Sequence, residues 1–129
     1  MGESRPDRAR LRFPAQLRVR RKSDFDSAFR KGRRFGDPLL SMTVRSNDAG
    51  VPRLGLAIAA RTVGNAVARN RLRRIIRESF RLVQHELPPV DVIVGARAAV
   101  RDAPAPHVRA SLAALWSKVA SQCAPSSAP

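Results

Sequence analysis

The chain has 129 residues, of which 43% are hydrophobic, and this length supports one compact domain but not two of ordinary size. Its formal net charge is +15, from 25 Lys and Arg against 10 Asp and Glu, so its partners are expected to be polyanions: RNA, DNA or an anionic membrane. No apolar run is long enough to span a membrane, and the N-terminal segment lacks the apolar stretch of a secretory signal. We therefore expect a cytoplasmic protein without membrane association.

The arginine-rich N-terminus precedes the part of the chain in which apolar residues become periodic. Residues 1–15 have no periodic apolar pattern, which predicts a disordered basic arm. A single α/β domain is expected over residues 16–121. Residues 122–129, rich in Ser, Ala and Pro, are expected to form a disordered tail.

The first helix is predicted to begin at Ser23, which can cap it, with Asp26 at the reciprocal position of a capping box. Phe25 and Phe29 mark its apolar side, and Gly32 marks its end. Two roles are open for these phenylalanines. They either pack the helix on the sheet or, beside the cations that follow, stack unpaired bases in an electropositive groove.

Four short segments have the composition of β-strands. Residues 39–44 and 54–59 are apolar runs separated by a turn-forming cluster at residues 46–50, which predicts an antiparallel strand pair. Residues 33–35 are expected to add a short preceding strand. The apolar run at residues 90–95 has the length of a strand and is best placed as an interior strand with both faces covered.

A long arginine-rich helix is predicted over residues 65–86, where two prolines stop it. At about 100° per residue, its apolar and its cationic residues fall on opposite arcs. The apolar arc contains Leu72, Ile75, Ile76, Phe80 and Val83, and the cationic arc contains Arg73, Arg74, Arg77 and Arg81. This pattern predicts a helix that packs on a core with one side and binds a polyanion with the other.

The final helix is predicted to start near Pro106. Its apolar stripe consists of Val108, Leu112, Leu115, Trp116 and Val119, so Trp116 is expected in the core. The order of elements is then α-β-β-β-α-β-α. This order predicts a two-layer α/β (α+β) sandwich of one sheet with helices packed on it.

The chain offers no convincing catalytic or metal site of its own. The two histidines, His85 and His107, have no nucleophile or cysteine at a matching spacing, and the single Cys123 can form no internal disulfide. The glycines form no phosphate-binding loop, and the acids are scattered. If this chain takes part in catalysis, we expect another molecule to break the bond.

A charged helix face that merely contacts water is the alternative to polyanion binding. Such faces normally mix Glu with Lys, whereas Glu78 is the only acid between Arg69 and Arg81. Arginine also binds phosphates with a planar fork and stacks on bases, which favours nucleic acid. A structural RNA-binding protein, such as a ribosomal protein or RNA chaperone, stays open, and a DNA-binding helix-turn-helix is disfavoured because no second helix precedes Asn65.

One stretch of the arginine-rich helix closely resembles the signature of the bacterial ribonuclease P protein component. It runs Asn65-Ala66-Val67-Ala68-Arg69-Asn70-Arg71-Leu72-Arg73-Arg74 and continues with Arg77-Glu78 and Phe80. The resemblance extends upstream to residues 23–32 and downstream to residues 91–97. It covers roughly residues 17–119 in the same order.

The resemblance implies a small protein that binds a large catalytic RNA and, with it, removes the 5′ leader from precursor tRNA. The RNA would carry out the hydrolysis with Mg²⁺ that it mainly holds itself, so the protein alone is not expected to be catalytic. The protein would act as a monomer, one per RNA, and would bind no DNA. A left-handed βαβ crossover, rare among proteins, is also implied.

The resemblance also nominates binding residues by position. Those expected to contact the catalytic RNA are Arg61, Asn65, Arg69, Asn70, Arg71, Arg73, Arg74 and Arg77. Those expected to line a cleft for the single-stranded leader are Phe25, Phe29, Arg30 and Met42. The chain departs from the family pattern in having Met42 where many relatives have an aromatic residue, and Ala60-Arg61 where they often have two lysines.

Overall fold

A computed structural model describes residues 32–123 of the chain. The predicted basic arm, the first helix with Phe25, Phe29 and Arg30, and the end of the predicted tail lie outside these residues. The described elements are, in order, β1 (Arg33–Gly36), β2 (Leu40–Ser46), β3 (Arg53–Ala57), α3 (Ala60–Val63), α4 (Ala66–Val83), the 3-10 helix η3 (Gln84–Glu86), β4 (Val90–Ala96), the 3-10 helix η4 (Ala98–Asp102) and α5 (Ala105–Gln122).

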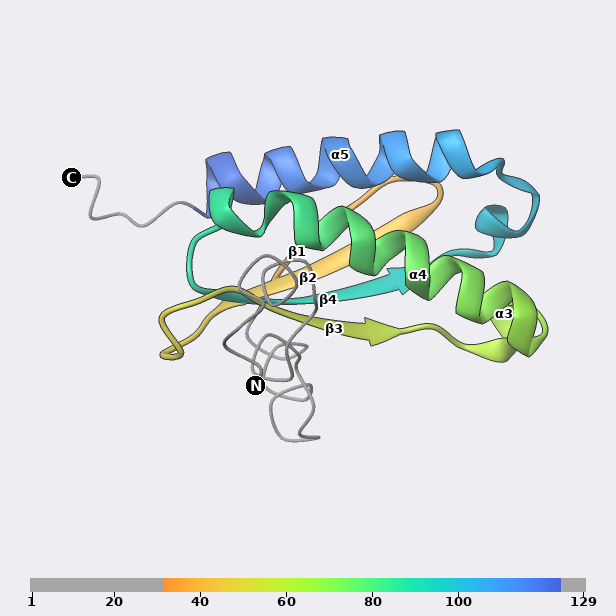
Figure 1. Cartoon of the computed structure of the whole chain (residues 1–129), viewed down its shortest axis with the longest axis horizontal. Helices are drawn as coiled ribbons and strands as arrows, with labels where there is room; N and C mark the ends of the chain where they lie inside the picture. Colours follow the sequence, from red (N-terminus) through yellow and green to blue (C-terminus); the bar gives the residue numbers. More distant parts are fainter. Residues whose placement is uncertain (1–31, 124–129) are drawn as a thin grey trace, which may run out of the picture.

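The strands form one sheet in the order β1-β2-β4-β3, and α4 and α5 lie side by side over it (Figure 1). The two-layer α+β architecture is therefore confirmed, as are the short first strand, the arginine-rich helix and the final helix. The short helices α3 and η4 were not predicted. Both are a turn or so long, and their residues have no helical apolar period.

The predicted pairing of the second and third strands is wrong. Strand β2 pairs with β4 in antiparallel orientation, from Leu40 opposite Ala96 to Ser46 opposite Val90. Strand β3 pairs with β4 in parallel, so β4 lies between the two strands that were expected to be neighbours. The expected interior position of β4 is confirmed. The parallel pair is joined through α4, so β3, α4 and β4 form a βαβ unit.

Residues alternate between the two faces of the sheet, and one face carries the hydrophobic core. Paired positions such as Met42 with Val94 and Leu54 with Val92 point to the side of α4 and α5. The helices contribute the other half of the core, with fully buried side chains at Ile76, Phe80, Leu112, Leu115, Trp116 and Val119. On the arginine-rich helix the buried residues are Leu72, Ile75, Ile76 and Phe80, so the side predicted to pack on the core is confirmed.

Met42 belongs to this core and not to a leader cleft. It is 1% exposed, lies opposite Phe35 of β1 and Val94 of β4, and packs in the apolar cluster shared with the helices. Its expected place in the cleft is therefore wrong. Because side chains alternate along a strand, the residues of β2 that point to the opposite face are Ser41, Thr43 and Arg45.

The opposite face of the sheet carries a buried ion pair. Arg53 donates from Nε to Asp91 Oδ1 and from Nη2 to Asp91 Oδ2, both at 2.7 Å, and Asn47 Nδ2 donates to the same carboxylate at 2.8 Å. Asn47 also donates from its backbone N–H to the carbonyl of Pro89. Asp91 is 3% exposed, and these bonds compensate its burial. The cluster ties the β2–β3 loop to the beginnings of β3 and β4.

The contact between α4 and α5 is built around one aromatic pair. The ring centroids of Phe80 and Trp116 lie 5.7 Å apart with an interplanar angle of 55°, a tilted arrangement that aromatic rings favour. The indole N–H of Trp116 donates to Ser79 Oγ at 2.7 Å. Trp116 is 2% exposed, so its predicted core position is confirmed.

A second buried polar contact joins the β1–β2 turn to α5. The Asp37 carboxylate accepts hydrogen bonds from the backbone N–H groups of Leu39 and Leu40 and from the hydroxyl of Ser111. Burial raises the pKa of Asp37, but the hydrogen bonds from Ser111, Leu40 and Leu39 and the charge of Arg97 lower it by more. The net effect is a pKa below the ordinary value of 3.8.

This lowered pKa makes a prediction about acid stability. Because the folded protein favours the ionised Asp37, the carboxylate stabilises the fold at pH values above 3.8 and loses this effect as the pH falls through the folded pKa. We expect the free energy of unfolding of Asp37→Asn to lie below that of the wild type at neutral pH. The gap should narrow below pH 3.8 in denaturant titrations, and a gap constant down to pH 2 would contradict this assignment.

Candidate nucleic-acid interface

The start of α4 is fixed by its cap. The Asn65 side chain accepts a hydrogen bond from the backbone N–H of Ala68 at 2.9 Å, as an N-cap does, and this satisfies one of the free donors of the first turn. Asn65 was nominated as an RNA contact. Its Oδ1 is engaged in the cap, so its exposed amide nitrogen is the group available to a partner.

Gly64 makes the sharp turn between α3 and α4. Its φ is 115° and its ψ is −146°, a conformation that residues with a Cβ rarely adopt. A Cβ at this position would come no closer than 4.0 Å to Ala68, so the requirement is conformational and not steric. The glycine therefore sets the angle at which the arginine-rich helix leaves the short helix before it.

Replacing Gly64 by Asn is expected to lower the free energy of unfolding by about 1–3 kcal/mol, because the asparagine is forced into a glycine-only region. The matched control is Gly50→Asn. Gly50 has φ 78° with open space around it, which lies closer to the left-handed region that Asn tolerates, so we expect a smaller loss. Urea unfolding of both variants checks the prediction, and equal losses would contradict it.

The cationic residues of α4 other than Arg71 form one broad surface on the helix. Arg69, Arg73 and Arg77 follow one another at four-residue spacing and so lie along one line. Asn70, Arg74 and Arg81 lie beside this line on the arc that faces away from the core. Arg74 and Arg77 are exposed, and Arg73 and Arg81 are half-buried. We call Arg69, Asn70, Arg73, Arg74, Arg77 and Arg81 the cationic face of α4.

The cationic face is held partly in place by its own side chains. Arg73 Nη1 donates to Asn70 Oδ1 at 3.2 Å, which links neighbouring members of the face. Arg69 is half-buried, and its Nε has no hydrogen-bond partner among residues 32–123. A buried donor without a partner lowers the stability of the fold.

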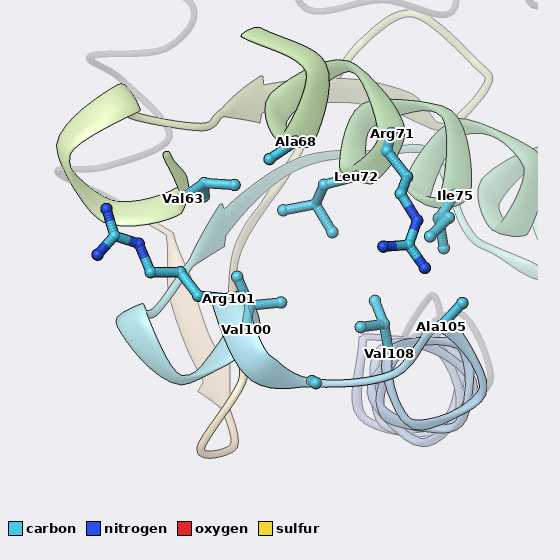
Figure 2. A pocket seen from close by; sticks show the side chains of 10 residues that line it. Val63, Ala68, Arg71, Leu72, Ile75, Val100, Arg101, Ala105 and Val108 are labelled. Atoms are coloured by element: carbon cyan, nitrogen blue, oxygen red, sulfur yellow. The ribbon is translucent and has the colours of Figure 1, made fainter. Parts of the chain in front are cut away.

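Arg71 lies apart from the cationic face. At 100° per residue it is about 160° around the helix from Arg73, on the side turned toward α5. It lines a pocket between α3, the first half of α4, η4 and the start of α5 (Figure 2). The pocket has a second arginine, Arg101 of η4, on its other side. The structure therefore places Arg71 in the pocket, apart from the other arginines of α4 that were predicted to contact the RNA.

Arg61 and Arg101 complete the basic surroundings of the start of α4. Arg61 is exposed on α3, directly before the turn at Gly64. Arg101 is exposed on η4, and α3 packs against η4. Sequence reasoning missed Arg101 because it lies thirty residues after Arg71, in a segment without a periodic pattern.

Arg33 has a structural partner. It donates to the carbonyl oxygen of Gln122 at 2.8 Å and to Gln122 Oε1 at 3.2 Å, and its guanidinium lies 5.4 Å from the ring centroid of Phe35. A cation at this position stabilises the carboxyl end of α5. Arg33 therefore holds β1 to the last turn of α5.

Residues 32–123 contain no cluster of three His, Cys, Asp or Glu side chains that could hold a metal ion. Asp37 and Asp91 are engaged in hydrogen bonds within the fold. These residues therefore do not fit a magnesium site of the protein's own. In the same part of the chain no helix is long and apolar enough to cross a membrane.

Comparison with known proteins decides the family. The family model described as Ribonuclease P matches residues 13–120, which is most of the chain. The chain belongs to the ribonuclease P protein family. The ribonuclease P protein component of Klebsiella pneumoniae is 42% identical over 107 residues, 83% of this chain and 90% of that protein. The protein from Escherichia coli O139:H28 is 41% identical over the same shares.

Solved structures of ribonuclease P proteins have the same fold. The Staphylococcus aureus protein matches with a TM-score of 0.74 and 28% identity, over 80% of this chain and 96% of that one. The Thermotoga maritima protein, in complex with 1-(4-fluorophenyl)-2-thiourea, matches with a TM-score of 0.70 and 29% identity, over 76% of this chain and 95% of that one. The resemblance seen in the sequence is thereby confirmed for family and fold.

Proposed function

We propose that this chain is the protein subunit of a cytoplasmic ribonucleoprotein that removes the 5′ leader from precursor tRNA. In this proposal the chain binds the catalytic RNA through the cationic face of α4, and one protein acts with one RNA. The observation that carries the proposal is the two-sided character of α4. Its core side is buried at Leu72, Ile75, Ile76 and Phe80, while its other side presents arginines with a single intervening acid.

The chemistry of the described residues indicates which part of the reaction the protein performs and which part the RNA performs. A surface of arginines can neutralise phosphates and release their counterions, which lowers the repulsion between RNA segments that must approach one another. Such a surface positions a scissile phosphate but provides no nucleophile. We therefore assign the bond cleavage to the RNA, with Mg²⁺ held mainly by RNA phosphates, and the protein alone is expected to be inactive.

The single-stranded leader is proposed to bind beside the face of the sheet opposite α4 and α5. Phe25, Phe29 and Arg30, nominated by the family resemblance, stay proposed members of this site. Met42 is replaced in the proposal by Arg45 of β2, which points to that face and is half-buried. Binding by stacking and charge would discriminate little between leader sequences.

The test is cleavage of precursor tRNA by the cognate RNA at low Mg²⁺, with and without purified protein. We expect the protein to raise the rate strongly at low Mg²⁺ and less as Mg²⁺ increases, because both supply positive charge to the same RNA. Absence of stimulation at every Mg²⁺ concentration would refute the proposal. Co-purification of the protein with ribosomal subunits in place of a single non-ribosomal RNA would favour a structural RNA-binding protein.

A further inference from the structure

We propose that the pocket between α3, α4, η4 and α5 receives one unstacked nucleobase of the RNA, whose flanking phosphates bind Arg71 and Arg101. This inference rests on the proposed RNA partner and adds a specific mode of contact to it. The floor of the pocket is formed by Leu72 and Ile75 of α4, Val100 of η4 and Val108 of α5 (Figure 2). The two arginines lie on opposite sides of that floor.

The pocket is open to solvent and lies at the edge of the hydrophobic core. Val63, Leu72, Ile75, Val100 and Val108 keep 3–7% of their surface exposed, whereas the central core residues of the sheet keep 2% or less. Its volume is about 70 Å³. A cavity needs about 10–15 Å³ by this measure to hold a single water, so this pocket has room for a larger group.

The residues that line the pocket favour a ligand that carries negative charge and also has a flat apolar group. Eight of its ten residues are apolar, the other two are arginines, and none is acidic. A nucleotide offers both parts at the right distance, because its base buries apolar surface while its phosphates meet guanidinium groups. The lining supplies no other polar side chain to read the base edge, so we expect little preference for base identity.

Position favours RNA over a protein partner. The pocket opens next to the start of α4, whose other side is the cationic face, so one polyanion can follow the helix and reach both. Arg71, turned away from that face, then has a partner of its own. A single α4 would thus hold RNA from two sides, through phosphates on one and through a base on the other.

The proposal is tested by filling the pocket without removing a charge. Ala68 and Ala103 line it from different elements, and Ala68→Leu or Ala103→Leu would occupy the space that the base needs. Ala110→Leu, on the exposed side of α5, is the control with equal added bulk. We expect each filled variant to bind the cognate RNA about tenfold more weakly, and the control to bind within twofold of wild type.

Filled variants that bind RNA as tightly as wild type would overturn the proposal, and so would an equal loss in the Ala110→Leu control. Thermal unfolding of each variant shows whether it is folded. A second measurement needs no variant: in methyl-labelled wild-type protein, adenosine 5′-monophosphate should shift the resonances of Leu72, Ile75 and Val100, whereas inorganic phosphate should not. Shifts caused by an Asp-Phe dipeptide but not by the nucleotide would assign the pocket to a protein partner.

These experiments distinguish failure of the pocket proposal from failure of the proposed function. If wild-type protein failed to bind the cognate RNA, the proposed function would fail, while the nucleotide titration would still decide whether the pocket takes a base. If wild type bound RNA and the filled variants bound equally well, only the pocket would be refuted.

Discussion

Replacing Arg73 and Arg74 together by alanine is expected to weaken binding of the catalytic RNA by about 25- to 60-fold at 0.1 M monovalent salt. We assume that each of the two side chains contacts one phosphate. Each phosphate contact contributes about 0.7–0.9 to the slope of log affinity against log salt. The slope should therefore fall by about 1.4–1.8. Filter binding or fluorescence anisotropy across a series of salt concentrations measures both quantities.

The matched control removes the same charge elsewhere. Arg109 and Lys118 are exposed on α5, and replacing both by alanine lowers the net charge by two, as the α4 variant does. If the cationic face of α4 is the binding surface, the α5 variant should keep the wild-type slope. Equal losses in the two variants would mean that RNA responds to net charge and not to this face. Lysines at positions 73 and 74 should keep the slope but lose part of the affinity, because the planar fork is absent.

Phe80→Ala is expected to have the largest effect on stability, lowering the free energy of unfolding by about 3–5 kcal/mol. Phe80 is fully buried between the helices and the sheet and packs against Trp116. Its removal leaves a cavity that its neighbours fill only in part. Because a domain of this size is stable by only about 5–15 kcal/mol, the variant would be close to unfolding at 37 °C.

Trp116 is the only tryptophan of the chain, so its fluorescence reports directly on the contact between α4 and α5. Urea unfolding followed by fluorescence and by circular dichroism should give the same midpoint in the wild type. Phe80→Leu, which keeps most of the apolar volume, should cost much less. A loss below 1 kcal/mol for Phe80→Ala would show that Phe80 does not anchor α4 to the core.

The elements of this fold were largely predictable, but one pairing was not. The turn-forming cluster at residues 46–50 indicated neighbouring strands, yet β4 inserts between β2 and β3. A largely apolar run such as residues 90–95, in which Asp91 is the only charged residue, is typical of a strand in the interior of a sheet. The interior position of β4 was therefore predictable from the sequence. The identity of the strands beside it was not, because strand pairing depends on contacts between residues distant in sequence.

The candidate site was predicted at the level of the helix but not of each residue. Hydrophobic periodicity separated the core side of α4 from its cationic side, because the period of a helix is fixed. Met42 was misplaced because one residue of register changes the face of a strand to which a side chain points. The role of Arg71 also needed the structure, since the pocket is formed by η4 and α5, whose positions no local pattern gives.

The chain contains few acids, and Asp37 and Asp91 are committed to internal hydrogen bonds. Salt should therefore act in opposite directions on the two states of the protein. It screens the repulsion among the arginines of the free chain and stabilises it, while it would weaken the proposed complex with RNA. At low salt the proposed RNA partner would then be the principal stabilising ligand, contributing about 2.7 kcal/mol when its free concentration is a hundred times the Kd. In a cell, protein made in excess of its RNA would thus be the fraction most open to proteolysis, so that the RNA sets how much protein persists.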